Sequence, residues 1–316
     1  MSGLEQILGE SDSMRKVRDL VLKIASSPSN VLITGERGTG KELVAKVIHD
    51  VSGTRGGAFV SVGCSAVPPE VLALDLFGLS AGQQRGQNQT LLEQAHQGTL
   101  FLDEISELDL SLQARLIQQL EGQLDQRVPR QKPLWVDVRF VASTSANLLR
   151  EIEARRFRQD LYYRLNVVEI TLPPLRDRLE DVSILAEAFL RRYSNEHGMP
   201  LKSIGPEAMA LLTKYLWPGN VRELQGVLER GYALSNRQVI LPEDLPIGLQ
   251  QATQQCTTIF PLPGQEKTLA EIEGEYIRLI LERTGGNKYQ TASILGIDRK
   301  TLYRKIAEMN QPGGHE

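Results

Sequence analysis

The sequence is poor in the residues that build disulfide frameworks and metal centres. Only two cysteines occur among its 316 residues, Cys64 and Cys256, and they lie far apart. This number argues against a disulfide framework and favours a reducing compartment. The four histidines are scattered without the spacing of metal ligands, so no metal site built on histidine or cysteine is indicated.

An excess of positive charge and long apolar runs are missing as well. The formal net charge is −3, so any nucleic-acid-binding surface must be local. No apolar run approaches the length that crosses a membrane, and the first residues carry no signal pattern. With 41% apolar and 24% charged residues, the composition is that of a soluble globular protein. We therefore expect a cytoplasmic protein of two or three compact units without a membrane partner.

The most informative stretch is a glycine-rich turn between a short apolar run, Val31–Thr34, and an amphipathic helical segment. Gly35, Gly40 and Lys41 match the G-x-x-x-x-G-K pattern of a phosphate-binding P-loop. Glycines let backbone N–H groups surround an anion, and the lysine reaches the terminal phosphates. An ordinary glycine-rich turn is the alternative, and the flanking strand and helix favour the P-loop. Glu42 replaces the Ser or Thr whose hydroxyl usually holds Mg²⁺.

A second stretch, Thr99–Glu104, is an apolar strand that ends in two carboxylates. This is the Walker B form, in which Asp103 would hold Mg²⁺ and Glu104 would polarise the water that attacks the γ-phosphate. Alone the pattern is weak, because many buried strands end in acids. Downstream of a P-loop, and followed by a predicted helix at 109–121, it is strong.

Short apolar strands alternate with helices through the first half of the chain. Further strands are predicted at 58–62, 137–142 and 166–171. The alternation predicts a parallel, doubly wound α/β sheet with its ligands at the carboxyl ends of the strands. From about 180 to 235 the periodicity becomes helical, which predicts a separate helical subdomain.

The last part of the chain changes character again. An amphipathic helix is predicted at 268–283, followed by two short helices at 288–295 and about 298–308. The predicted domain boundaries are therefore an α/β part at 1–173, a helical part at 174–248, a flexible linker at 249–267 and a small all-α domain at 268–316.

Several further motifs follow the P-loop and the Walker B strand in order. They are Phe157–Asn166, Leu172–Arg178 and Trp217–Leu224. From about residue 6 to 245 the chain closely resembles the AAA+ domain of bacterial enhancer-binding proteins, the activators of sigma-54 RNA polymerase. The tail from 268 resembles the Fis-type helix-turn-helix that ends most members. The resemblance implies a P-loop AAA+ parallel sheet with a helical lid, plus a small helix-turn-helix domain.

The resemblance also implies ATP and Mg²⁺ as ligands and assigns roles to matched positions. Asp103 and Glu104 would be the Walker B acids, and Thr144, in the sensor I segment, would contact the nucleotide. Glu42 is usual at its place in this family. The ATP phosphates would be bound by the P-loop residues Gly35, Glu36, Arg37, Gly38, Thr39, Gly40, Lys41 and Glu42.

Three arginines match functional positions of the family. Arg158 and Arg164 match the arginines that reach the ATP of the neighbouring subunit and stabilise transition-state charge in trans. Arg222 matches the sensor II arginine, which touches the phosphates from the lid. Without the resemblance, the alternative of solvated or intramolecular pairing would be favoured for all of them.

The chain departs from the family pattern at three places. Members that remodel sigma-54 carry a Gly-Ala-Phe-Thr-Gly-Ala loop, whereas the interval Leu79–Gln89 is shorter and lacks the aromatic-threonine tip. Gly63 replaces the asparagine that restrains the Walker B glutamate, and Ser145 replaces the sensor I asparagine. The missing loop predicts impaired contact with sigma-54. The two substitutions predict weakened ATP hydrolysis rather than weakened ATP binding.

The helix-turn-helix resemblance places a positioning helix at 287–295 and a recognition helix at 298–308, which would enter a major groove. The predicted DNA-binding residues are Lys288, Arg299, Lys300, Thr301, Tyr303, Arg304 and Lys305. The helix at 268–283 would pair two copies and so set two half-sites about one DNA turn apart. A small three-helix bundle with a basic solvated face is the alternative.

These observations predict an ATP-binding, DNA-binding transcriptional regulator that acts without normal sigma-54 remodelling. Its expected partners are promoter or enhancer DNA, an RNA polymerase holoenzyme and further copies of itself, from dimer to hexamer. No sensory segment precedes the P-loop module, so a regulatory protein partner is also considered. The alternatives are a competent sigma-54-dependent activator ATPase and a nucleotide-binding scaffold with little turnover.

Overall fold

The computed structural model describes residues 3–52, 56–78, 89–124, 137–246 and 287–309, with shorter pieces at 248–249, 268, 273–274, 276–278, 280–281 and 284. The chain divides into two units, Met1–Leu245 and Pro246–Glu316. Each unit has an apolar core of its own.

Within the described part of the first unit, five parallel strands form one sheet. In spatial order they are β2 (Phe59–Gly63), β3 (Thr99–Asp103), β4 (Arg139–Thr144), β1 (Val31–Thr34) and β5 (Val168–Thr171). Thr34 lies opposite Thr144, and Gly63 lies opposite Asp103. The carboxyl ends of the P-loop strand and the Walker B strand therefore meet at one edge of the sheet. The predicted α/β class is confirmed.

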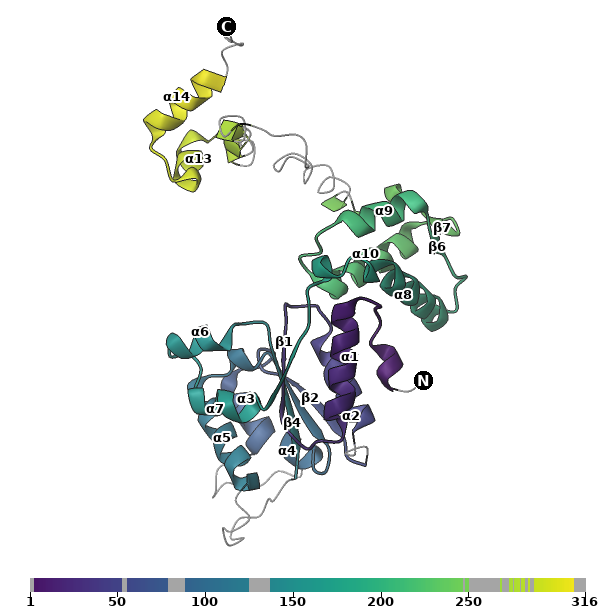
Figure 1. Ribbon diagram of the computed structural model, residues 1–316, viewed down its shortest axis with the longest axis vertical. Coiled ribbons are helices and arrows are strands. Elements are labelled where there is room, and N and C mark those ends of the chain that lie inside the picture. The colour runs from purple at the N-terminus through teal and green to yellow at the C-terminus, as the bar shows by residue number, and fades with distance from the viewer. Residues whose placement is uncertain are drawn as a thin grey trace. The chain divides into compact units, whose positions relative to one another are not determined.

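The central strands are apolar on both faces because helices cover both faces. In β1, Val31 and Ile33 pack with α1 (Asp12–Ala25) and α2 (Lys41–Val51), whereas Leu32 belongs to the opposite core. Figure 1 shows α1 and α2 on one side of the strands and α5 (Leu110–Leu124) and α7 (Gln159–Leu165) on the other. The helices of this second layer are α3 (Pro69–Phe77), α4 (Leu91–Gln94), α5 (Leu110–Leu124), α6 (Leu148–Glu153) and α7 (Gln159–Leu165).

The helical subdomain follows β5, as the change of periodicity predicts. Between residues 174 and 246 it contains α8 (Asp181–His197), α9 (Pro206–Lys214) and α10 (Asn220–Leu234). Trp217 is fully buried in its core, and its indole N–H donates to the carbonyl of Leu212 at 2.9 Å. The sequence pattern did not predict two very short parallel strands here, β6 (Ser203–Ile204) and β7 (Val239–Ile240).

The second unit contains α13 (Lys288–Leu295) and α14 (Arg299–Met309), with Gly296 between them at a φ of +67°. Ala292 and Leu302 are buried together between the two helices. The predicted helix at 268–283 is described only in short helical pieces, and nearly all of the predicted linker lies outside the described residues. The two short helices match the all-α class expected for this end.

None of the helices in the described ranges has the length and apolar character that a membrane crossing requires.

Candidate functional site

The P-loop connects β1 to α2 at the carboxyl edge of the sheet. Gly38 and Gly40 adopt positive φ angles of +80° and +103°. A Cβ atom on Gly38 would clash with the carbonyl oxygen of Gly219 in the helical subdomain. Gly40 precedes α2, and no side chain caps that helix. The positive end of α2 is therefore open to a phosphate group.

Lys41 is almost completely buried beneath this loop. Its Nζ atom lies 3.0 Å from Oε1 of Glu104 and donates to the carbonyl oxygens of Gly35 and Glu36 at 2.9 and 3.2 Å. The side chains of Lys41 and Glu104 are only 5% and 11% exposed. A phosphate that binds Lys41 would therefore compete for the ammonium with the Glu104 carboxylate and with these two carbonyl groups.

Asp103 ends β3 beside the P-loop. Its Oδ1 atom accepts a hydrogen bond from the hydroxyl of Ser143 at 2.5 Å, and its side chain is partly exposed. A carboxylate at this edge is the kind of oxygen ligand that Mg²⁺ prefers. The position of Asp103 thus fits a metal ion held jointly with a nucleotide phosphate.

Glu104 follows with an unusual backbone. Its φ of +55° lies in the left-handed region, which is costly for a residue other than glycine. Its Oε2 atom accepts two hydrogen bonds from Ser145, from the backbone N–H at 2.9 Å and from the hydroxyl at 2.7 Å. Burial raises the pKa of Glu104, but the hydrogen bonds from Ser145 and Lys41 outweigh this effect, so its pKa lies below the usual value. The carboxylate is therefore held as an anion.

The helical subdomain contacts the P-loop through Glu36. The guanidinium of Arg176 donates two hydrogen bonds to the Glu36 carboxylate at 2.6 and 2.8 Å. The amide of Asn220, which is fully buried, donates to Glu36 at 3.1 Å and to the carbonyl of Arg37 at 3.0 Å. The hydrogen bonds from Arg176 and Asn220 lower the pKa of Glu36 to about 2. Asn220 was assigned no role from the sequence, although it lies within the motif Trp217–Leu224, two residues before the predicted sensor II arginine.

Two further arginines approach the loop from the same subdomain. The backbone N–H of Arg222 donates to the carbonyl of Gly38 at 3.2 Å, which places the predicted sensor II residue next to the P-loop. Arg178 is buried, and its guanidinium donates to the carbonyl of Thr39 at 3.2 Å. Burial lowers the pKa of Arg178. Arg178 lies within the motif Leu172–Arg178, but its sequence context predicts no role for it.

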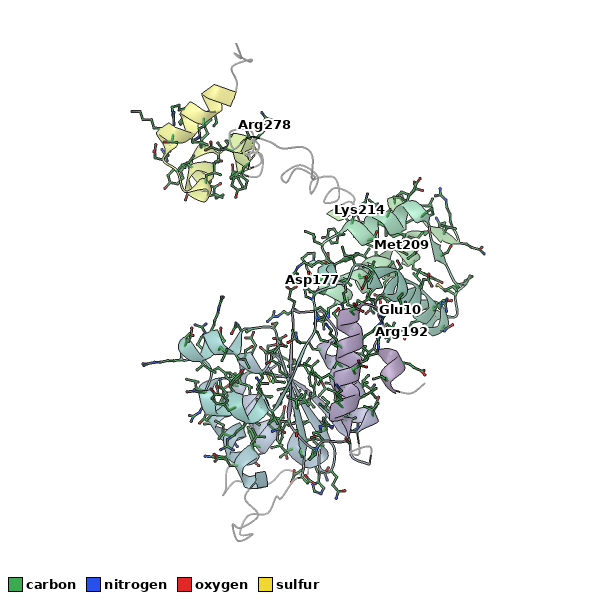
Figure 2. The ribbon with its side chains drawn as sticks, viewed as in Figure 1. Glu10, Asp177, Arg192, Met209, Lys214 and Arg278 are labelled. Carbon is green, nitrogen blue, oxygen red and sulfur yellow. The ribbon has the colours of Figure 1, made fainter. Side chains whose placement is uncertain are left out.

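Asp181, at the start of α8, connects the helical subdomain to the segment before α1. Its carboxylate accepts hydrogen bonds from the backbone N–H groups of Glu10 and Ser11 at 2.6 and 2.9 Å, and from the Ser11 hydroxyl at 2.7 Å. Figure 2 labels Glu10 beside this subdomain. A second polar contact therefore holds the two parts of the first unit together.

The remaining residues predicted around the nucleotide have partners nearby. Thr144 accepts a hydrogen bond from the N–H of Ala146 at 3.0 Å and donates to the hydroxyl of Ser106 at 3.2 Å. Glu42 accepts a hydrogen bond from the Ser61 hydroxyl at 3.2 Å. Both lie at the carboxyl edge of the sheet, and their contact with a nucleotide stays a prediction.

The two arginines predicted to act in trans lie just before α7 and in its last turn. Arg158 pairs with Asp160 at 2.8 Å, and Arg164 pairs with Glu121 at 2.6 Å. All four side chains are substantially exposed, so these ion pairs are weak and can be exchanged. Within one chain each arginine thus has a carboxylate partner, and its action on a neighbouring subunit stays a prediction.

In the second unit, cations and aromatic rings pair across α13 and α14. The Arg299 guanidinium lies 4.2 Å from the centre of the Tyr289 ring, and the Lys288 ammonium lies 4.7 Å from the centre of the Tyr303 ring. Both rings are more than half exposed. Three predicted DNA-binding residues are thus brought together on one surface. Tyr289 joins them there, although its aromatic side chain was not singled out from the sequence.

The other predicted DNA-binding residues differ in their surroundings. Thr301 donates its hydroxyl and its backbone N–H to Asp298, at 2.8 and 3.0 Å, at the start of α14. The ammonium of Lys305 lies 2.5 Å from Glu273 and is largely covered. Lys300 and Arg304 are exposed. Arg299 is thus more exposed than Lys305, and the contact of these residues with DNA stays a prediction.

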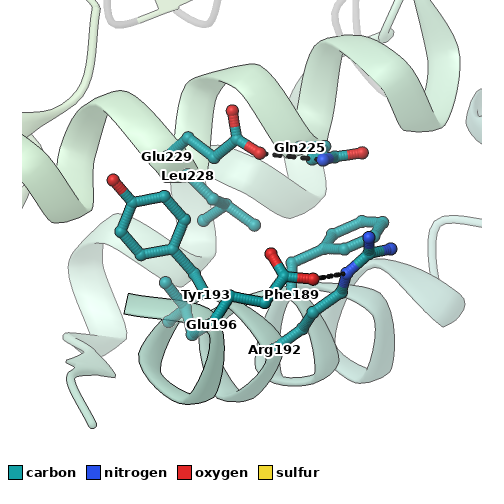
Figure 3. A pocket seen from close by; sticks show the side chains of 8 residues that line it. Phe189, Arg192, Tyr193, Glu196, Gln225, Leu228 and Glu229 are labelled. Carbon is teal, nitrogen blue, oxygen red and sulfur yellow. Dashed lines mark hydrogen bonds and ion pairs between the residues drawn. The ribbon is translucent and has the colours of Figure 1, made fainter. Parts of the chain in front are cut away.

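A small pocket lies between α8 and α10 (Figure 3). It is lined by Phe189, Tyr193, Leu228 and their neighbours and bordered by the Arg192–Glu196 and Gln225–Glu229 pairs. Its volume of about 10 Å³ is about the least that can hold a single water molecule. It cannot hold a nucleotide, and its lining includes no residue of the P-loop.

Cys64 is buried directly after β2 and forms no disulfide. Burial, together with the charge of Asp103, raises the pKa of its thiol to about 12. The thiol is therefore neutral and unreactive. Cys256 lies outside the described residues.

Comparison with known protein families assigns three successive parts of the chain. Residues 7–171 match the sigma-54 interaction domain, residues 176–259 match the AAA+ ATPase lid domain, and residues 268–309 match the bacterial regulatory proteins of the Fis family. The chain belongs to the sigma-54 interaction domain family. It is thus related to transcriptional regulators that combine an AAA+ ATPase module with a helix-turn-helix.

Individual relatives extend over nearly the whole chain. The regulatory protein AtoC of Escherichia coli is 41% identical over 309 residues, which cover 96% of this chain and 67% of AtoC. The transcriptional regulatory protein ZraR of Salmonella typhimurium is 40% identical, covering 95% of this chain and 68% of ZraR. A crystal structure of NtrX from Brucella abortus in complex with ATP is 34% identical, with a TM-score of 0.69, and covers 96% of this chain and 69% of NtrX.

The departures from the family pattern can now be placed. Gly63 ends β2 opposite Asp103 and has no side chain to offer. Ser145 follows β4 and contacts Glu104 directly. The interval Leu79–Gln89, in which the loss of the Gly-Ala-Phe-Thr-Gly-Ala loop is predicted, lies outside the described residues except for Gln89. Only its sequence therefore bears on contact with sigma-54.

Proposed function

We propose that this chain binds ATP with Mg²⁺ at the P-loop, assembles with further copies of itself and binds promoter or enhancer DNA to regulate transcription in the cytoplasm. The observation that carries the proposal is the convergence of Lys41, Asp103 and Glu104 at one edge of the sheet, beside the open end of α2. Bound Mg²⁺ would neutralise charge on the phosphates. The chain's own contribution is to hold the phosphates through Lys41 and the P-loop N–H groups.

The proposal includes regulation without normal sigma-54 remodelling. Its support is the sequence of Leu79–Gln89, which lacks both the aromatic residue and the threonine of the family loop. An RNA polymerase holoenzyme remains the expected partner, with a different mode of contact. A regulatory protein could control the module by altering its nucleotide state or its assembly.

Nucleotide measurements test the first part. Lys41→Ala is expected to abolish ATP binding, because the loop loses the cation that reaches the terminal phosphates. Glu104→Gln is expected to retain ATP binding and to lose turnover. The measurements are titration with a fluorescent ATP analogue and steady-state phosphate release over a range of protein concentrations. Binding that survives Lys41→Ala would place the nucleotide elsewhere.

Open-complex formation on a sigma-54 promoter tests the second part. The purified chain with ATP is expected to give no more open complex than sigma-54 polymerase alone. Efficient opening would support the first alternative, a competent sigma-54-dependent ATPase. The second alternative, a scaffold with little turnover, is suggested by the pairing of Lys41 with Glu104. Tight ATP binding without concentration-dependent turnover would support it.

A further inference from the structure

The turn between α9 and α10 contains two residues with a left-handed backbone. Trp217 has a φ of +51° and Asn220 has a φ of +56°. This conformation is costly for any residue other than glycine, and asparagine is one of the few that adopt it readily. Trp217 is fully buried and donates its indole N–H to Leu212, which fixes one end of the turn in the core of the helical subdomain. Asn220 fixes the other end, at the P-loop.

The fully buried side chain of Asn220 forms hydrogen bonds through both of its polar atoms. Its Nδ2 atom donates to the Glu36 carboxylate at 3.1 Å and to the carbonyl of Arg37 at 3.0 Å. Its Oδ1 atom accepts from the backbone N–H of Leu175 at 2.7 Å. Asparagine is the shortest side chain that offers two donor hydrogens together with an acceptor. The amide therefore joins the start of α10 to the P-loop and to the segment after β5.

The first turn of α10 also contacts the P-loop through the backbone. The N–H of Arg222 donates to the carbonyl of Gly38 at 3.2 Å. The carbonyl oxygen of Gly219 lies so close to Gly38 that a Cβ atom there would be only 2.3 Å from it. The Glu223 carboxylate accepts from the N–H of Gly219 at 2.7 Å and so closes the turn. A change in the position of Asn220 would therefore move Arg222 relative to the loop.

The side chain of Arg222 is available to a ligand at this position. It is exposed, and none of the ion pairs in the described ranges of the chain engages its guanidinium. Guanidinium groups bind phosphate oxygens strongly when their geometry is fixed in advance. The direction of this guanidinium depends on where α10 begins, and Asn220 is the first residue of α10.

We propose that Asn220 is the positioning residue for Arg222. It holds the start of α10 on the P-loop, so that the guanidinium of Arg222 is kept where the phosphates of ATP would bind. This inference rests on the proposed function, since it requires ATP at the P-loop. Asn220 acts through the helix and need not touch the nucleotide.

ATP affinity in a double-mutant cycle tests the inference, with a fluorescent ATP analogue and the full chain. Arg222→Ala is expected to weaken binding about tenfold, because a hydrogen-bonded cation is lost from the phosphates. Asn220→Gly tolerates the left-handed backbone but removes the amide, and it is expected to weaken binding about fivefold. In the Arg222→Ala background the same change is expected to have little further effect, since the cation that it positions is already gone.

Two further variants distinguish positioning from a purely structural role. Asn220→Asp keeps the shape of the side chain but loses both donors and places a second carboxylate beside Glu36. It is expected to weaken binding at least as much as Asn220→Gly, again only while Arg222 is present. Gln225→Ala is the matched control, because it removes an exposed amide that bonds to Glu229 further along α10, and it should bind ATP like wild type. Circular dichroism at the temperature of the titration checks that each variant is folded.

The outcomes separate the inference from the proposed function. Equal losses of affinity in the two backgrounds would overturn the positioning role, because Asn220 would then act independently of Arg222. An unchanged affinity in both Asn220 variants would overturn it too. An Arg222→Ala variant that binds ATP like wild type would overturn it while leaving ATP binding at the P-loop intact. A wild-type chain that does not bind ATP would overturn the proposed function itself.

Discussion

Glu36 lies in the P-loop, but its carboxylate forms hydrogen bonds with residues of the helical subdomain. Its carboxylate receives hydrogen bonds from Arg176 and Asn220, both of which come from the helical subdomain. These bonds require the ionised form, which is why the pKa falls to about 2. A single carboxylate thus couples the loop that would hold ATP to the subdomain that would cover it.

The low pKa of Glu36 predicts a particular pH dependence of stability. The folded-state pKa lies below the unfolded value of 4.5, so the stabilisation is fully present above about pH 4.5 and is lost as the pH falls toward 2. Glu36→Gln is expected to lower the thermal unfolding midpoint by about 2 °C at pH 7, a modest amount because the pair is partly exposed. The difference from wild type should shrink steadily below pH 4.5.

Thermal unfolding followed by circular dichroism between pH 2.5 and 8 checks this prediction. Glu243→Gln is the matched control, because it removes a carboxylate from an exposed pair with Arg237 on the helical subdomain. It should change the midpoint little at any pH. A Glu36→Gln effect that grew on acidification would contradict the assignment.

At the scale of elements, the local pattern was sufficient for most helices and strands. The alternation of apolar strands and amphipathic helices predicted the sheet and its helical layers, because each strand carries enough apolar residues to be recognised alone. The β6–β7 pair was missed, since strands of two residues each have no detectable period. The predicted strand at 137–142 was displaced by two residues from β4, which is within the usual uncertainty of strand ends.

Contacts between elements were the part that local patterns could not supply. Gly63 and Ser145 were each recognised as departures, but the bond from Ser145 to Glu104 depends on β4 lying next to β3. Likewise, Asn220 reaches Glu36 only because the helical subdomain folds back onto the P-loop. Such contacts depend on the spatial order of elements, which many arrangements of the same pattern could satisfy.

The pairing of α13 with α14 leads to a prediction about DNA binding. Tyr289 holds the Arg299 guanidinium above its ring, so Tyr289→Ala should leave Arg299 charged but less well oriented. We expect the affinity for a random-sequence DNA duplex to fall about twofold to fivefold, the value of an exposed cation–π contact. Because no charge is lost, the dependence of affinity on salt should stay the same.

Fluorescence anisotropy over a range of salt concentrations checks this expectation. Tyr289→Phe keeps the ring and should behave as wild type. Arg299→Ala removes a cation and should reduce the salt slope by about one counterion. An unchanged affinity in Tyr289→Ala would show that the ring does not orient Arg299 for DNA, and an altered salt slope would point to a different contact.

At the scale of the whole molecule, the two arginines near α7 decide whether one chain is a complete unit. Arg158 and Arg164 pair with carboxylates of their own chain, and these exposed pairs can be exchanged for a stronger partner. The phosphates of a neighbouring subunit would be such a partner, because guanidinium groups bind phosphate oxygens with two parallel hydrogen bonds. If so, each ATP site would need residues from two copies of the chain.

Mixing inactive variants tests this arrangement. Lys41→Ala should bind no ATP, and Arg164→Ala should bind ATP but hydrolyse it poorly. In a mixture, a Lys41→Ala subunit can supply its intact Arg164 to the ATP that is bound by an Arg164→Ala neighbour. When equal amounts of the two variants assemble at random, about one quarter of the interfaces combine an intact Lys41 with an intact Arg164 from the neighbour. Turnover should therefore recover to about one quarter of the wild-type value. Replacing the first partner with a Lys41→Ala, Arg164→Ala double variant should abolish the recovery. If the activity of the mixture never exceeds the summed activities of the separate variants, Arg164 does not act on a neighbouring subunit. Its role would then lie within its own chain, where it pairs with Glu121.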